Sequence, residues 1–90
     1  MNIIAGRIIN VKELQPYFSS TRWNVVYKTC EGLDSIILTS HDSNILAPLE
    51  NESIQIIPYF DEFDEFNIRR FFLIFISGRQ FSIWRSPEEQ

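Results

Sequence analysis

Six aromatic and basic residues between positions 17 and 28 have the side chains best suited to hold a ligand. They are Tyr17, Phe18, Arg22, Trp23, Tyr27 and Lys28. Aromatic rings stack on bases and cations neutralise phosphates, so this combination is typical of proteins that bind single-stranded nucleic acid. In a strand, Trp23 and Tyr27 share one face. That face either contacts bases or is simply the inward, core-forming face of the strand.

A second group of residues joins aromatic and acidic side chains. Phe60, Phe63 and Phe66 recur every three residues, and the gaps hold Asp61, Glu62, Asp64 and Glu65. In a helical or 3₁₀ turn this spacing places the rings on one side and the carboxylates on the other. The segment then either caps a barrel end with its rings or docks a basic partner through its charges. Its spacing lacks the pattern of a calcium loop.

The stretch from Arg69 to Trp84 predicts a β-hairpin that turns at Ser77-Gly78-Arg79. The run Phe71–Ile76 is apolar on both faces of a strand, so both faces need cover. One set of alternating residues fits the core. We expect the other set, Phe72, Ile74 and Ile76, to contact another subunit, unless the domain itself covers both faces.

Catalytic and metal-binding groups are sparse. His41 stands beside Asp42 in a polar segment, and no nucleophile elbow or glycine-rich phosphate loop accompanies it. Cys30 with one histidine does not make a four-ligand zinc site. The sequence therefore predicts a protein that is not an enzyme and has no cofactor or metal.

The elements that must position these groups are mostly strands. Segments 2–12, 23–30, 34–40 and 53–60 are rich in strand-forming residues, and the hairpin supplies the rest. Segment 41–53 is the one stretch with a helical pattern, which Pro48 limits to a turn or two. We predict one all-β domain over residues 1–86, a barrel of five or six strands with one short helix, followed by an acidic tail at 87–90.

This order of elements resembles the OB-fold. The likeness rests on Gly6 inside a long first strand, where a glycine often marks a bulge or sharp bend that lets one strand serve two sheets. It rests also on Asn44–Ile56, which looks like the OB helix whose leucines plug the barrel before the fourth strand. Many OB domains place Gly-Asp before that strand, where this chain has Glu52-Ser53. The resemblance implies a binding site on the second and third strands and the loops beside them.

Composition limits the kinds of partner and the cellular location that the sequence supports. The net charge is −4, which disfavours general nucleic-acid binding, yet six of the twelve acids lie in 61–65 and 88–89. The rest of the chain has six acids and eight bases, a balance of +2. A single cysteine favours an intracellular protein, cytoplasmic or nuclear, and no apolar run is long enough for a membrane helix.

These observations predict a non-enzymatic, OB-like binding subunit in nucleic-acid metabolism. It would contact single-stranded DNA or RNA through the second strand and another subunit, of its own or another kind, through the C-terminal hairpin. The alternative is a protein–protein adaptor or inhibitor that acts through the acidic–aromatic segment 60–66.

Overall fold

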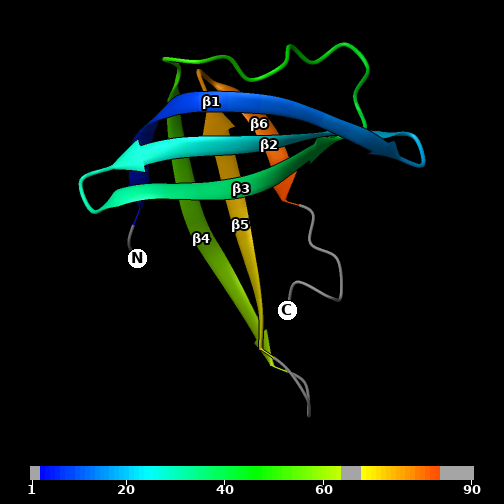
Figure 1. The fold of residues 1–90 in the computed structure, drawn as a ribbon. Coiled ribbons are helices and arrows are strands. Elements are labelled where there is room, and N and C mark those ends of the chain that lie inside the picture. The colour runs from blue at the N-terminus through cyan, green and yellow to red at the C-terminus, as the bar shows by residue number, and fades with distance from the viewer. Residues whose placement is uncertain (1–2, 64–67, 84–90) are drawn as a thin grey trace.

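Six antiparallel strands close into a small barrel in the computed structural model (Figure 1). The structure describes residues 3–63 and 68–83, and describes side chains for residues 3–57 and 72–83. The strands are β1 (Ile4–Tyr17), β2 (Ser20–Thr29), β3 (Gly32–Ser40), β4 (Ser53–Phe63), β5 (Ile68–Ile76) and β6 (Arg79–Ile83). The predicted all-β barrel is confirmed. No helix in the described part has the length and apolar character needed to cross a membrane.

The ring of strands runs β1-β2-β3-β6-β5-β4, so two three-stranded meanders meet along two seams. At one seam β1 pairs with β4 over Ile4–Arg7, while the remainder of β1 pairs with β2. The other seam joins β3 to β6 through two residue pairs, Leu38 with Ile83 and Thr39 with Ser82. The first strand therefore serves both meanders, as Gly6 in its middle indicated.

The hairpin turns follow local backbone chemistry. Ser77 and Gly78 both have positive φ, at 49° and 81°, which is the backbone that a tight two-residue hairpin turn requires. The predicted turn between β5 and β6 is thus confirmed. The connection between β1 and β2 is much shorter than the predicted loop, because β1 continues through Pro16 to Tyr17 and only Phe18 and Ser19 form the turn.

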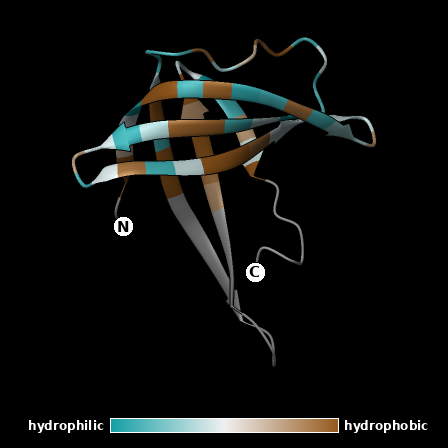
Figure 2. Cartoon of the chain, in the orientation of Figure 1, coloured by the Kyte–Doolittle hydropathy of each residue, from teal (hydrophilic) through white to brown (hydrophobic). Residues whose placement is uncertain are grey.

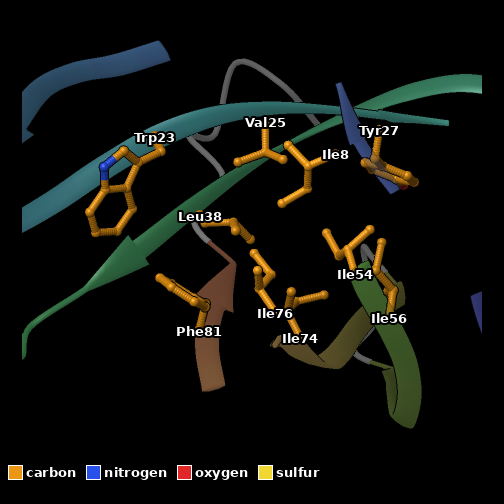
Figure 3. Close-up of a cluster of buried hydrophobic side chains, with 10 residues drawn as sticks. All are labelled: Ile8, Trp23, Val25, Tyr27, Leu38, Ile54, Ile56, Ile74, Ile76 and Phe81. Atoms are coloured by element: carbon orange, nitrogen blue, oxygen red, sulfur yellow. The ribbon is translucent and has the colours of Figure 1, made fainter. Parts of the chain in front are cut away.

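The core is one cluster inside the barrel (Figure 3). It contains Ile8, Trp23, Val25, Tyr27, Leu38, Ile54, Ile56, Ile74, Ile76 and Phe81. Inward residues come from all six strands, since each strand alternates between inward and outward positions. Teal and brown alternate accordingly along β1 in Figure 2. Burial of large side chains at roughly 1.5–3 kcal/mol each is the main source of stability.

The predicted short helix is absent, and residues 41–52 form an irregular segment instead. Pro48 cannot donate a helical hydrogen bond, and here it is fully buried against the barrel. Ile45 packs against the core, whereas Leu46 and Leu49 are 70% and 63% exposed. The leucines predicted to plug the barrel therefore do not do so, and Ile45 packs against the core from this segment instead.

The expected helical or 3₁₀ turn over the acidic–aromatic segment is also incorrect for its first half. Strand β4 continues to Phe63 and pairs with β5, with a bulge between Pro58 and Phe60. Asp61 lies opposite Arg70 and Glu62 opposite Arg69 in this register.

Candidate nucleic-acid interface

Trp23 and Tyr27 lie in the core rather than on a binding face. Each is only 4% exposed, and Figure 3 places them at opposite ends of the buried cluster. Trp23 packs edge-on against Phe81, with ring centroids 5.7 Å apart. Burial, followed by the neighbouring Asp34 carboxylate, raises the pKa of the Tyr27 hydroxyl. The alternative interpretation, that these residues are the inward face of β2, is the one that the structure supports.

The opposite face of the same sheet carries the positive charge. Residues paired across antiparallel strands point to the same side, so the register defines an outer face on β1, β2 and β3. Its members are Arg7, Asn10, Lys12, Leu14, Arg22, Asn24, Val26, Lys28, Leu33, Ser35, Ile37 and Thr39. All except Thr39 are at least partly exposed. Four of these side chains are cations and none is a carboxylate.

The acidic residues of these strands lie at the alternate positions, which belong to the inner side of the sheet. Glu13 lies opposite Trp23, and Asp34 lies opposite Tyr27. The side chains of Trp23 and Tyr27 point inward. Charge is therefore segregated across the sheet, even though the chain as a whole has a net charge of −4. A face of this kind has a positive local potential although the chain is acidic overall.

A bulge explains why Lys12 was not predicted as part of this site. Arg7 and Lys12 are five residues apart, so strict alternation would put them on opposite faces. The register shift between Ile8 and Asn10 adds one residue to β1 and brings both cations to the outer face. The glycine at position 6 signalled a bend, but no residue type marked the bulge itself.

The tip of the β1–β2 hairpin presents two of the predicted aromatics. Tyr17 and Phe18 are 46% and 87% exposed, and their rings meet edge to face with centroids 4.7 Å apart. The Arg22 guanidinium lies 5.9 Å from the Tyr17 ring centroid and donates to the Gln15 carbonyl at 2.9 and 3.0 Å. Arg22 also belongs to the outer face, so the aromatic tip continues that face.

The backbone of Phe18 is unusual for its residue type. Its φ of 53° lies in the left-handed region, which a bulky side chain seldom adopts and where Gly, Asn or Asp is common. The ring also receives little burial in return for this conformation. A strained and exposed aromatic residue has a functional explanation more readily than a structural one.

The other end of the outer face is set by Arg7 and Lys28, which lie opposite each other on β1 and β2. Arg7 donates from Nη1 to the Asn51 carbonyl at 2.6 Å, which holds its guanidinium beside the segment before β4. Lys28 is exposed. The predicted residues Tyr17, Phe18, Arg22 and Lys28 are therefore placed along one surface, without Trp23 and Tyr27.

A serine–histidine contact joins β2 to the segment after β3. Ser20 Oγ lies 2.8 Å from His41 Nδ1, and Ser20 is 7% exposed. The Asp42 carboxylate accepts a hydrogen bond from the Asn44 amide. A buried hydroxyl is poorly placed to attack a substrate, so this contact is best explained as a structural tie. In the described part of the chain, no group of three His, Cys, Asp or Glu residues is arranged to hold a metal ion.

The residues predicted to contact another subunit are on the wrong side of the sheet. Ile74 and Ile76 are fully buried and Phe72 is partly buried against the core. The outward residues of β5 are Leu73 and Phe75, both half-buried. Phe60 and Phe63 belong to β4, but their side chains lie outside the described part, as does the whole of Phe66.

Comparisons with models of known protein families, with curated proteins and with solved structures find no match for this chain.

Proposed function

We propose that this chain binds single-stranded nucleic acid on the outer face of β1, β2 and β3. The phosphates lie along Arg7, Lys12, Arg22 and Lys28, and unpaired bases stack on the Tyr17–Phe18 pair. The observation that supports this most is the presence of four cations without a carboxylate on that face. The proposed role is binding without catalysis, in an intracellular setting.

An OB-like character of the barrel is part of the proposal. A first strand that pairs with both β2 and β4 around Gly6 favours it, as does a candidate site on the second and third strands. Six strands instead of five and the missing helix are departures from that fold.

The proposal predicts weak, salt-sensitive binding. A labelled single-stranded oligonucleotide, followed by fluorescence anisotropy at low salt, should bind with a dissociation constant on the order of micromolar. Four phosphate contacts give a slope of about −3 for the logarithm of affinity against the logarithm of salt concentration. Lys12→Gln should reduce that slope by about 0.7.

Arg70→Gln is the matched control, because it removes one positive charge from β5, outside the outer face. Phe18→Ala tests stacking and should weaken binding about tenfold, while the exposed position spares the fold. No detectable binding at low salt would rule the proposal out. An Arg70→Gln effect equal to that of Lys12→Gln would show that only overall charge matters.

A second candidate is contact with a protein through the β4–β5 ribbon. From Ile57 to Phe63, β4 pairs with β5 alone, so the ribbon runs on beyond the seam with β1. In the sequence, Asp64 and Glu65 follow directly after Phe63. Asp64→Asn with Glu65→Gln should abolish capture of a basic protein partner from cell extract, and should leave oligonucleotide binding unchanged. If the double variant captures the same proteins as the wild type, this candidate is excluded.

A further inference from the structure

Strand β3 has an open hydrogen-bonding edge over most of its length. It pairs with β2 from Gly32 to Ser40, but with β6 only at Leu38 and Thr39. Among the described residues, the edge from Gly32 to Ile37 therefore has no strand beside it, as the lower edge of β3 in Figure 1 illustrates. Open strand edges are templates for pairing with another chain.

The other open edges of this barrel carry the residues that prevent such pairing. The open part of β1 contains Lys12 and Pro16, and that of β4 contains Pro58. The open part of β5 contains Arg69 and Arg70. Proline removes a donor and charged side chains resist stacking against a second strand, so these edges are protected.

The open edge of β3 contains no proline and no cation. Its sequence from Leu33 to Ile37 is LDSII, with Asp34 as the one charge. The Asp34 carboxylate accepts a hydrogen bond from the Ser35 amide at 2.8 Å, and it also lies beside the Tyr27 hydroxyl of β2. Leu33 is 65% exposed on this strand. An exposed apolar residue on an open edge that has a single charge and no proline indicates a surface that another strand covers.

We propose that a second copy of this chain pairs with β3 through this edge, antiparallel, about a two-fold axis at Ser35. In that register apolar side chains meet on the outer side, and the one charge of each strand does not face its own copy. Leu33 faces Ile37 of the second copy on the outer side, and Asp34 faces Ile36 of the second copy on the inner side. The two Asp34 carboxylates are then not opposite each other, and like charges directly opposite would destabilise the pair.

The pairing has a consequence for the candidate nucleic-acid interface. A two-fold axis perpendicular to the sheet keeps both outer faces on the same side. The cations of the two copies then line one continuous surface of six strands, with β3 and its copy in the middle. The dimer does not depend on nucleic-acid binding, so either proposal can fail without the other.

Sedimentation measured from micromolar to millimolar protein tests the dimer, with Leu33→Lys as the disrupting variant. Two Leu33–Ile37 pairs are lost by symmetry, so the dimer should dissociate at least about tenfold more readily. Leu46→Lys is the control, because it makes the same change at a leucine of similar exposure that lies outside β3, in the segment between β3 and β4. A wild type that stays monomeric throughout overturns the proposal, as does an equal effect of both variants.

Cross-linking tests the register. A residue on the two-fold axis faces its own copy, so Ser35→Cys should form a disulfide-linked dimer under mild oxidation. The exposed Cys30 is first replaced by serine, and Ser43→Cys at another exposed serine is the control. Cross-linking of Ser35→Cys well above the control supports the register. Equal or absent cross-linking overturns it, and leaves this edge to residues 84–90 or to a different partner.

Discussion

Trp23 is the residue whose position differs most from the role that its residue type suggested. An aromatic residue next to Arg22 suggested base stacking, but the ring is buried against Phe81. Its indole Nε1 is buried and has no hydrogen-bond partner among the described atoms. A buried unpaired donor costs stability, so packing of the large ring must outweigh this cost.

Trp23→Ala should therefore destabilise the fold by about 3–5 kcal/mol, because it removes a large core side chain and leaves a cavity. The free energy of unfolding in urea measures this. Phe18→Ala, at an exposed position, should change it by less than about 0.5 kcal/mol. If Trp23→Ala instead unfolds at the wild-type midpoint but binds oligonucleotide less well, Trp23 acts at the surface.

Glu52 and Arg79 fasten the segment before β4 to the final hairpin. Arg79 donates from Nη1 and Nη2 to the two carboxylate oxygens, each at 3.0 Å, and from Nη2 to the Ala47 carbonyl at 3.1 Å. The Glu52 carboxylate also accepts from the Leu49 amide at 2.8 Å. The hydrogen bond from Arg79 is the largest cause that lowers the pKa of Glu52, from 4.5 to about 2.

This pKa predicts acid sensitivity. A carboxyl group with a lowered pKa in the folded state stabilises the fold above its unfolded pKa, and the stabilisation is lost as the pH falls from 4.5 towards 2. Glu52→Gln should cost about 2 kcal/mol at neutral pH and flatten the loss of stability in that window. Urea unfolding across this pH range measures both effects. Glu13→Gln, which removes an exposed carboxylate from β1, should leave the acid-induced loss intact; the same flattening there would contradict the assignment.

At the scale of elements, β1 determines how the barrel closes. It passes from pairing with β4 to pairing with β2 around Gly6, whose backbone lies close to Lys28 of β2. A Cβ atom on Gly6 would stand 2.5 Å from the Lys28 carbonyl oxygen, a backbone atom that has little freedom to move. Glycine is required at position 6 because there is no room for a Cβ atom between β1 and β2.

Gly6→Ala should destabilise the barrel by about 1–3 kcal/mol, because the two strands must separate to admit the methyl group. Thermal unfolding followed by circular dichroism provides the measurement. Ala5→Ser adds one atom at the neighbouring exposed position and should be close to neutral. A neutral Gly6→Ala would mean that the seam between β1 and β4 is looser than the close contact indicates.

The seam between β3 and β6 is the weaker closure of the whole molecule. Strand β2 has a neighbour on both sides from Arg22 to Lys28, whereas β3 meets β6 at two residue pairs. Local opening is expected where few hydrogen bonds and contacts join two elements. The barrel should therefore open first at this seam.

Hydrogen exchange should show this gradient. Amides from Trp23 to Tyr27 should exchange slowly, while alternate amides between Leu33 and Ile37, which point away from β2, should exchange quickly in dilute protein. Raising the protein concentration should slow those β3 amides if two copies pair there. Equal protection of both strands in dilute protein would show that the seam is closed along its length.

The sequence by itself determined the all-β class, most of the strands and the turn at Ser77-Gly78, because alternation and turn chemistry are local properties. It also indicated the bend at Gly6. Local pattern did not decide which face of a strand points inward. The run Phe71–Ile76 is apolar on both faces, so either set of its alternating residues could point into the core.

Only the tertiary structure decided which face of each strand points inward and which residues lie beside one another. Closure of the barrel turned Trp23, Tyr27, Ile74 and Ile76 inward, and the bulge beside Ile9 brought Lys12 to the face of Arg7. Residues 41–52, which include the buried Pro48, form an irregular segment where a helix was expected. A one-residue shift of register reverses every side chain that follows it, so long-range pairing determines which residues remain available for binding.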